Sequence, residues 1–330
     1  MKKKKDKLDI PQKLGLLCIF SVFLDKAIRG GGLPFDFYYY YPIFLVFLVS
    51  LPIKGYQITM PPRWFNLGLL SIITASVFVT LYKGILGFEL VKQVFGILFT
   101  SITYYNVIRV FKYDIARIFN YYLVFAFWVA LHGVIDNILH IGGIHLTKVL
   151  QDGAFQYREY GIMGEPFYLA MAITPAIVYY TCYFKRTWNT AKFKYLVLLA
   201  CYLVTYSSTA VMGIGLAAFF GLYLNDFFNL RRNRIIFAPL FLAPVALLVF
   251  YLIENVDLIN KRYNDTTALF LSSEIDIKEA GKSNSSTFAL YSNYIIARDS
   301  FLDNPLFGSG LGSHPLIYEE AFLKYFPKKY

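Results

Sequence analysis

Long runs of uncharged, mostly apolar residues alternate with short charged segments along most of this chain. A helix that crosses a bilayer needs about 20 such residues, with a tolerated range of roughly 17 to 25. Five runs meet that length and are predicted to be membrane spans: Phe37–Ile53, Trp64–Tyr82, Ile118–Ile135, Pro166–Phe184 and Ile235–Ile253. Two shorter runs, Leu14–Leu24 and Gln93–Ile108, have the length of a span only if neighbouring charged residues are included in it.

The longest uncharged run, Tyr195–Asn225, holds 31 residues, which is too many for one span and few for two. Basic clusters flank it at positions 185–194 and 231–234. Because basic residues near spans favour the cytoplasmic side, both clusters belong there and the chain must cross the membrane twice within the run. We therefore predict two short helices joined by an outer turn at Tyr206–Thr209, which brings the total to nine spans.

The basic residues also predict the orientation of the bundle. With the N-terminus inside, cytoplasmic segments carry 18 of the 32 lysines and arginines, in keeping with the positive-inside rule. We predict that residues 1–253 form the transmembrane helix bundle, with an external loop near 140–165, and that residues 254–330 form a large extracytoplasmic segment. Within that segment, the spacing of apolar side chains over Ser286–Leu302 predicts an amphipathic helix that ends at Asn304-Pro305.

The composition agrees with a membrane protein and excludes a soluble one. Hydrophobic residues make up 57% of the chain, charged residues only 16%, and the mean hydropathy is +0.49, whereas soluble domains carry about 25% charge. The predicted fold class is all-α, a polytopic helix bundle in the lipid bilayer. The net charge of +11 is spread over short loops, so we expect no nucleic-acid partner. Cys18, Cys182 and Cys201 lie in apolar runs and predict no disulfide framework.

Ionisable residues at membrane depth are candidates for function because burying them is expensive. Glu89 and Lys92 stand three apart on one helical face, and we expect them to form an ion pair. His132, Asp136 and His140 recur every four residues on one face of the predicted fifth span. This stripe fits a metal site or a proton relay, but one helix supplies an incomplete ligand set. We interpret it as a polar stripe lining an outward cavity, and we predict no metal and no cofactor.

One external motif covers residues 156–166 and runs directly into a predicted span. Pro166 suits a first helical turn, and Glu165 complements the positive end of that helix. Arg158 is open to two interpretations. It is either an interfacial arginine or an anion ligand, since its planar guanidinium pairs well with phosphate oxygens.

A second external motif covers residues 304–315. It places glycines at the alternate positions Gly308, Gly310 and Gly312, with His314 shortly after them. Alternate glycines permit left-handed backbone and close approach to a ligand. A surface turn would use the same residues, so the motif by itself leaves both interpretations open.

These motifs and the predicted turn resemble the O-antigen ligase/polymerase superfamily. Arg158-x-x-Gly161-x-x-x-Glu165-Pro166 is similar to its Arg-x-x-Gly…Pro signature at the start of a span. Thr205-Tyr206-Ser207-Ser208 is similar to its Thr-Phe-Ser turn between two short spans. Asn304-Pro305-Leu306-Phe307-Gly308-Ser309-Gly310-Leu311-Gly312 is similar to its Pro-Leu-hydrophobic-Gly-x-Gly-x-Gly stretch. The order and spacing of the motifs match from about the third span onward.

The resemblance implies a membrane glycosyltransferase of the bacterial cytoplasmic (inner) membrane. Such an enzyme polymerises undecaprenyl-pyrophosphate-linked oligosaccharide repeat units into a surface polysaccharide, with flippase and chain-length regulator proteins as partners. A polysaccharide ligase is the alternative within the same chemistry. A glycolipid transporter or flippase is the alternative from another class, and it would use the charges at membrane depth.

The resemblance also implies roles for individual residues. Arg158 would stabilise charge on the diphosphate leaving group, and His314 would be the base that removes the proton of the attacking sugar hydroxyl. Glu165 is the second candidate base, or it orients Arg158. The residues expected to bind substrate are Arg158, Gly161, Arg298, Gly308, Gly310 and Gly312.

The chain also differs from that superfamily. Ser208 and Thr209 stand where many members have an arginine after the turn, and Ser286-Thr287-Phe288 stands where many have one ahead of the large-loop helix. We expect Arg298 or Lys282 to substitute for them. Members usually return to the membrane after the glycine motif, whereas this chain stops at Tyr330, so we expect a C-terminal truncation.

Overall fold

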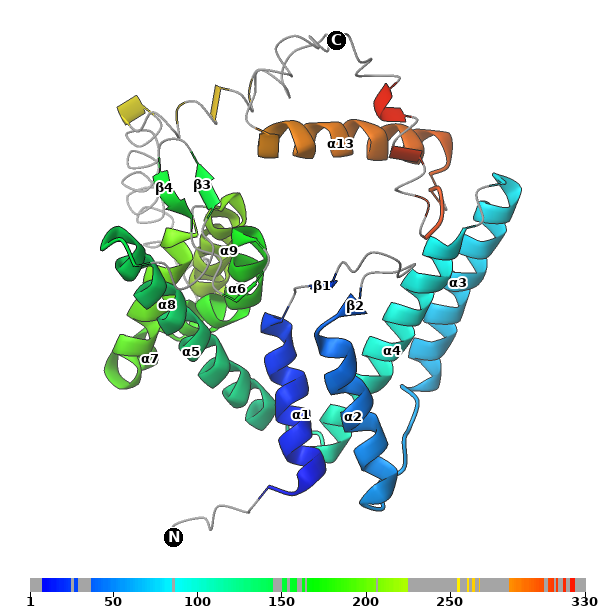
Figure 1. Cartoon of the computed structure of the whole chain (residues 1–330), viewed down its shortest axis with the longest axis horizontal. Coiled ribbons are helices and arrows are strands. Elements are labelled where there is room, and N and C mark those ends of the chain that lie inside the picture. The colour runs from blue at the N-terminus through cyan, green and yellow to red at the C-terminus, as the bar shows by residue number, and fades with distance from the viewer. Residues whose placement is uncertain are drawn as a thin grey trace, which may run out of the picture. The chain divides into compact units, whose positions relative to one another are not determined.

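The computed structural model describes residues 8–24, 27–28, 37–84, 87–144, 150–152, 155–158, 162–163, 165–205, 207–224, 254–255, 260, 263–264, 267, 285–305, 308–311, 313, 317–318 and 321–323. This part of the chain is mainly helical (Figure 1), as predicted. The helices are α1 (Ile10–Phe20), η1 (Ser21–Phe23, a 3₁₀ turn), α2 (Tyr40–Ile53), α3 (Arg63–Tyr82), α4 (Phe88–Val110), α5 (Ile115–Ile141), α6 (Pro166–Cys182), α7 (Phe184–Thr190), α8 (Lys192–Val204), α9 (Ser208–Leu224) and α13 (Ser285–Asp303).

Two described helices, α3 with 20 residues and α5 with 27, are long and apolar enough to cross a membrane. α6 and α7 are bent by 96° at the break between them, and they make a third candidate if taken as one span. Shorter apolar helices lie at Ile10–Phe23, Tyr40–Ile53 and Met212–Gly221. The protein therefore has two to three candidate membrane spans among its described residues, and the total of nine stays a prediction. The predicted span Ile235–Ile253 lies outside the described residues.

Several helix ends agree closely with the sequence pattern. α8 ends at Val204 and α9 begins at Ser208, so the break between them falls at the predicted turn. α13 extends one residue beyond the predicted amphipathic helix at each end. It buries Tyr291, Ile295 and Ile296, whereas Tyr294, Phe301 and Leu302 are exposed. The amphipathic character of this helix therefore stays a prediction.

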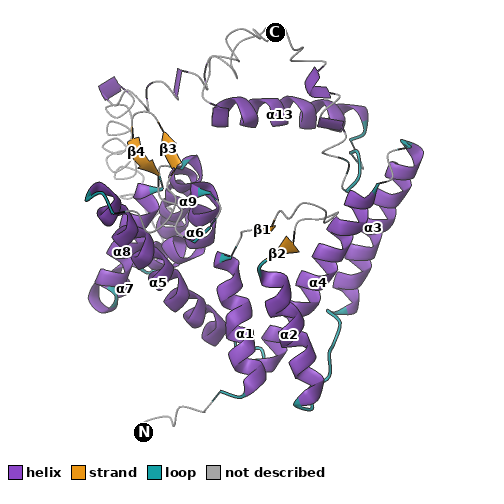
Figure 2. Cartoon of the chain, in the orientation of Figure 1, coloured by secondary structure: helices purple, strands orange, loops and turns teal. Residues whose placement is uncertain are grey.

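Two small antiparallel hairpins, which an all-helical prediction does not include, interrupt the helices (Figure 2). β1 (Ala27–Ile28) pairs with β2 (Phe37–Tyr38), and β3 (Leu150–Asp152) pairs with β4 (Phe155–Arg158). Isolated two-stranded hairpins are marginally stable in water. The all-α class therefore describes the scaffold, and the hairpins are additions to its connections.

The chain divides into two compact units. Unit 1 contains Met1–Met60 and Thr100–Ala238, and unit 2 contains Pro61–Phe99 and Pro239–Tyr330. The boundary between Phe99 and Thr100 falls within α4, so each unit holds part of that helix. These units group residues that contact one another. The predicted division at residue 253 instead separates the transmembrane bundle from the extracytoplasmic segment, and it stays a prediction.

Three helices of unit 1 meet around Tyr202. This side chain on α8 is fully buried, and its hydroxyl lies 2.7 Å from Thr174 Oγ1 on α6. A Cβ at Gly213 on α9 would collide with the same hydroxyl. The absence of a side chain at Gly213 therefore lets α9 pack closely on α6 and α8.

One end of unit 1 gathers several helix ends. There Tyr56 Oη donates to Asp9 Oδ2 at 2.6 Å, and Gln12 Nε2 donates to the carbonyl oxygen of Val110 at 3.3 Å. The start of α1 therefore lies beside the ends of α2 and α4. Basic residues predicted to be cytoplasmic share this end: Lys13, Lys54, Arg109, Lys112 and Arg117. Their gathering supports the predicted orientation, which stays a prediction.

Candidate functional site

The first motif begins in the β3–β4 hairpin and continues into α6. Arg158 is the last residue of β4 and pairs in register with Leu150. Met163, further along the motif, is buried. The dipeptide Asp152-Gly153, which begins at the last residue of β3, is a hairpin signal in the sequence, and it could have predicted this element.

Glu165 is the N-cap residue of α6 and has extended backbone angles, with φ −148° and ψ 152°. Its carbonyl oxygen accepts from the N–H groups of Tyr168 (3.1 Å) and Leu169 (3.3 Å). Its carboxylate is exposed and makes no capping hydrogen bond. Pro166 follows in the first turn, which confirms the predicted helix start. An exposed carboxylate is thus held at the positive end of a helix.

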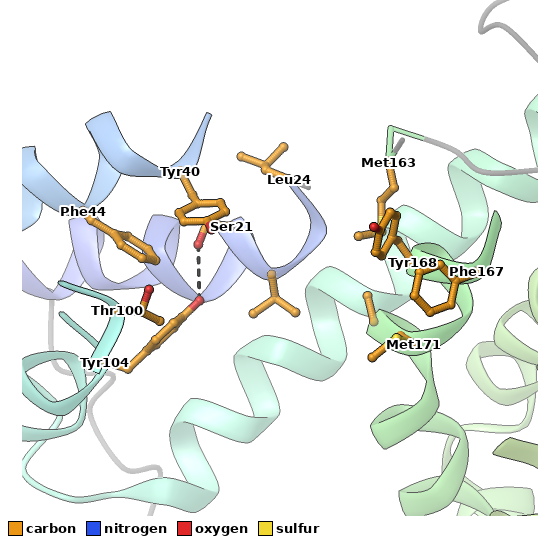
Figure 3. Close-up of a pocket in the computed structure, with 12 residues that line it drawn as sticks. Ser21, Leu24, Tyr40, Phe44, Thr100, Tyr104, Met163, Phe167, Tyr168 and Met171 are labelled. Carbon is orange, nitrogen blue, oxygen red and sulfur yellow. Dashed lines mark hydrogen bonds between the residues drawn. The ribbon is translucent and has the colours of Figure 1, made fainter. Parts of the chain in front are cut away.

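An apolar cavity of about 450 Å³ lies in unit 1 at the start of α6 (Figure 3). This volume falls within the roughly 300–1,000 Å³ of typical ligand pockets. The lining residues come from η1 and the residue after it, α2, α4, the segment before α6 and the first turns of α6: Ser21, Val22, Leu24, Tyr40, Phe44, Thr100, Tyr104, Met163, Phe167, Tyr168, Met171 and Ala172. Since Met163 belongs to the Arg158 motif, that motif contributes to the wall of the cavity.

The hydroxyls of Ser21 and Tyr104 are already bonded within the protein. Tyr104 Oη lies 3.4 Å from Ser21 Oγ, and both hydroxyls donate to the carbonyl oxygen of Cys18, at 3.2 Å and 2.7 Å. Figure 3 shows that most other lining side chains are aromatic rings, aliphatic groups or methionines. The lining suits a hydrocarbon chain better than a sugar, because buried sugar hydroxyls need hydrogen-bond partners.

The second motif forms a loop against α3 in unit 2. Gly308 (φ +58°) and Gly310 (φ +85°) both have left-handed backbone. A Cβ at Gly310 would lie 2.9 Å from Thr80 Cγ2 and 3.0 Å from the carbonyl oxygen of Ser76, both on α3. A Cβ at Gly308 would meet nothing within 4 Å. The close approach at Gly310 is therefore made to a helix, and ligand contact by either glycine stays a prediction.

Lys83, which no sequence motif singled out, lies at the same loop. It is the C-cap residue of α3, and its Nζ donates to Ser309 Oγ at 3.1 Å. Ser309 Oγ also lies 2.5 Å from Ser300 Oγ on α13. The signal available in the sequence was a lysine directly after a span predicted to end outside, on the same side as the glycines.

Arg298 has a different environment from the one expected of a phosphate ligand. It lies exposed on α13, and its Nη2 is 3.1 Å from Asp299 Oδ1. The neighbouring carboxylate offsets part of its charge. Binding of substrate by Arg298 therefore requires competition with Asp299, and it stays a prediction.

The candidate residues fall in separate parts of the structure. Unit 1 contains Arg158 and Glu165, and unit 2 contains Arg298, Gly308 and Gly310. For Arg158 the backbone is described and the side chain is not. The candidates outside the described residues are Gly161, Gly312, His314 and Lys282.

The charged groups at membrane depth are paired or buried. Lys92 Nζ lies 3.4 Å from Glu89 Oε2, which confirms the predicted ion pair. Asp136 and His140 are buried on α5, with Oδ1 and Nδ1 3.8 Å apart. His132, the third residue of the stripe, is half-buried, and a cavity lined by the stripe stays a prediction. Within the described ranges, no three His, Cys, Asp or Glu residues form a group that could hold a metal ion.

No family model matches the chain, and no curated protein or solved structure matches it either. The resemblance to the O-antigen ligase/polymerase superfamily therefore rests on the motifs quoted above. The residues and geometry of this chain are what support a function.

Proposed function

We propose that this chain polymerises undecaprenyl-pyrophosphate-linked oligosaccharide repeat units into a surface polysaccharide on the outer face of the bacterial cytoplasmic membrane. A flippase that delivers the units and a chain-length regulator would be its partners. The substrate has a hydrocarbon chain, a diphosphate and a glycan, joined in that order. Its site needs an apolar cavity, a cation near the cavity for the diphosphate, and a base for the acceptor hydroxyl.

The observation that carries the proposal is the position of the apolar cavity at the Arg158 motif. Met163 lines the cavity and stands five residues after Arg158. Five residues span at most about 18 Å when fully extended, so the backbone of Arg158 lies within that distance of Met163. Glu165, with its exposed carboxylate, is only two residues from Met163. One motif thus provides a cavity wall, a cation and a candidate base.

The proposed reaction moves a glycan from its lipid carrier to a sugar hydroxyl of a new unit. The hydroxyl oxygen bonds to the anomeric carbon, the bond from that carbon to the diphosphate oxygen breaks, and the electron pair leaves with undecaprenyl pyrophosphate. Arg158 would stabilise the developing charge by pairing with two phosphate oxygens. His314 or Glu165 would accept the proton of the attacking hydroxyl.

A ligase would use the same donor with another acceptor, so the cavity and the motif support it equally. A glycolipid transporter has less support. The charges at membrane depth that would serve it already have neighbours, with Glu89 beside Lys92 at 3.4 Å and Asp136 beside His140 at 3.8 Å. Ionisable residues within membrane segments commonly pair with one another in this way.

The test uses the purified full-length protein with a polyprenyl-pyrophosphate-linked repeat unit, and the glycan products are resolved by length. A polymerase yields a ladder of multiples of one unit. Arg158→Ala should abolish the ladder, and Arg158→Lys should restore little because an ammonium lacks the planar fork. Arg186→Ala, at an exposed arginine of α7, is the control and should give the wild-type ladder. A full ladder from Arg158→Ala would overturn the role of Arg158.

The wild-type protein also separates the alternatives. Unchanged substrate would contradict polymerisation. Transfer that appears only after a different acceptor is added would identify a ligase. Movement of the intact lipid across a vesicle membrane, without transfer, would identify a transporter.

The cavity is tested by a bulky side chain in its wall. Met171 lines the cavity and is 53% exposed, so Met171→Trp should raise the KM for the lipid-linked donor about tenfold by overpacking the space for the hydrocarbon. Met212→Trp is the matched control, because Met212 on α9 is 71% exposed and is not a lining residue of this cavity. Equal KM values for the two variants would show that the hydrocarbon binds elsewhere.

A further inference from the structure

Lys83 connects the end of α3 to the glycine loop, defined here as residues 308–311. Its backbone N–H donates to the carbonyl oxygen of Val79 at 3.0 Å, and its half-buried side chain donates to Ser309 Oγ at 3.1 Å. Lys83 and Ser309 are 226 positions apart in the sequence. Unit 2 therefore brings a cation and a glycine-rich loop together, although the sequence places the two only on the same side of the membrane and does not identify them as partners.

The backbone of the glycine loop alternates between left-handed and other conformations. Gly308 and Gly310 have φ values of +58° and +85°, whereas Ser309 between them does not have a positive φ. In backbone nests for anions, left-handed residues alternate with residues of other conformation, so that successive N–H groups turn toward one ligand. The N–H of Gly308 donates to the carbonyl oxygen of Asn304 at 2.8 Å, and Ser313 Oγ donates to that of Gly310 at 2.7 Å. These bonds hold the loop in this form.

The charge of Lys83 has no carboxylate within 4.0 Å among the residues that the structure describes. Two other described cations of unit 2 do have one, since Lys92 lies 3.4 Å from Glu89 and Arg298 lies 3.1 Å from Asp299. An ammonium has three N–H donors, and the hydrogen bond to Ser309 uses one. Lys83 therefore retains both charge and donors for an anion at the loop.

We propose that Lys83 and the glycine loop form a binding site for a diphosphate group. The identity of the ligand, the diphosphate of a polyprenyl-linked saccharide, rests on the proposed function. Lys83 suits this role better than Arg298, because Arg298 is exposed and already paired with Asp299. The loop supplies backbone N–H groups, and Lys83 supplies the charge-assisted contact.

A purely structural role for Lys83 would be to hold the loop through Ser309. The two roles differ in what the serine hydroxyl contributes. Ser309→Ala removes the tie between Lys83 and the loop but keeps the ammonium, whereas Lys83→Ala removes both. Binding of a diphosphate should therefore follow the charge at position 83 and should depend little on the hydroxyl at position 309.

The experiment measures binding by calorimetry to the full chain in detergent, with inorganic pyrophosphate and farnesyl diphosphate as separate probes. Lys83→Ala should weaken binding at least about tenfold, as expected for loss of a charge-assisted contact. Lys83→Arg and Ser309→Ala should each stay within about threefold of the wild type. Lys54→Ala is the matched control, because Lys54 is likewise the C-cap lysine of an apolar helix, α2. Unchanged midpoints of thermal unfolding show that each variant is folded.

Binding of both probes, with dependence on Lys83, supports a site for any diphosphate. If only the binding of farnesyl diphosphate depends on Lys83, the result supports a site for the lipid-linked form. Wild-type affinity in Lys83→Ala, equal losses in Lys83→Ala and Ser309→Ala, or no binding of either probe would each overturn the proposal. This assay measures binding and needs no turnover, so the two proposals can fail separately. If binding depends on Lys83 but the wild-type protein makes no polymer ladder, the proposed function is rejected and the diphosphate site stands.

Discussion

Gly310 lies so close to α3 that a Cβ would fall 3.0 Å from the carbonyl oxygen of Ser76. The alternate glycines in the sequence indicate backbone freedom, but they do not indicate which neighbour requires it. In the structure, Gly308 needs glycine only for its left-handed backbone, whereas Gly310 needs it for both backbone and contact. Two glycines of one motif therefore have different reasons to be glycine.

Substitution of the two glycines should separate those reasons. Gly308→Ala should cost about 1–2 kcal/mol, the penalty of a left-handed non-glycine residue. Gly310→Ala adds a steric clash with α3, worth roughly another 1–3 kcal/mol. The midpoint of thermal unfolding of the purified protein should therefore fall further for Gly310→Ala. Equal shifts for the two variants would contradict the observed packing of the loop on α3.

The start of α1 shows how an element boundary is set by side chains near it. Gln12 N–H donates to Asp9 Oδ1 at 2.8 Å, and Asp9 N–H donates to Gln12 Oε1 at 3.2 Å, a reciprocal cap. α1 consequently begins at Ile10, ahead of the predicted span Leu14–Leu24. The hydrogen bond from Tyr56 to Asp9 raises the pKa of Tyr56 above its ordinary value of 10.0, because it favours the neutral phenol.

Variants at Asp9 and Tyr56 should lower the midpoint of thermal unfolding in proportion to the contacts that they remove. Asp9→Ala removes the cap, worth about 1 kcal/mol, together with the acceptor for Tyr56, so it should lower the unfolding midpoint most. Tyr56→Phe removes only the bond to Asp9. The contribution of that bond to the free energy of unfolding is complete below pH 10, and it is lost as the pH rises through the raised pKa of Tyr56. The difference between wild type and Tyr56→Phe should therefore vanish at high pH, and a constant difference would contradict this role.

The orientation of the whole molecule depends on which side of the membrane its basic residues occupy. The end of unit 1 that holds the start of α1 and the ends of α2 and α4 is rich in lysine and arginine, and it is predicted to be cytoplasmic. The three cysteines, Cys18, Cys182 and Cys201, are all buried. A thiol reagent should therefore react slowly with the wild-type protein, which provides a low background for introduced cysteines.

Single cysteines at exposed positions test the predicted orientation in intact cells. A maleimide that cannot cross the membrane should label Ile144→Cys, which is predicted to be outside. The same reagent should label Lys54→Cys and Arg186→Cys only after the membrane is permeabilised, because both positions are predicted to be inside. The wild-type protein is the control. Labelling of Lys54→Cys in intact cells would reverse the proposed topology.

Much of the helical scaffold could be predicted because its signals are local. The uncharged run Trp64–Tyr82 predicts α3, which is observed as Arg63–Tyr82. The start of α6 follows from Glu165 and Pro166, which favour a helix N-terminus whatever surrounds them. Hydrophobicity, charge and capping act on each segment separately, so they can be read along the chain.

The candidate sites were only partly predictable because their contacts are not local. The motif residues Arg158 and Glu165 are visible in the sequence, but the cavity beside them needs side chains from four separate segments. The β3–β4 hairpin depends on pairing across strands, for which Asp152-Gly153 is only a local hint. Spacing of residues alone carries no information on such distant partners.

Apolar run lengths and the distribution of charge alone indicate a helical membrane protein and the positions of most described helices, since the bilayer requires every span to satisfy its own backbone hydrogen bonds. Only tertiary packing shows that Gly310 rests on α3 and that Lys83 reaches Ser309 from 226 positions away. The physical reason is that burial and backbone hydrogen bonding within a span are properties of one segment, whereas a cavity or an anion site is a property of several segments held together.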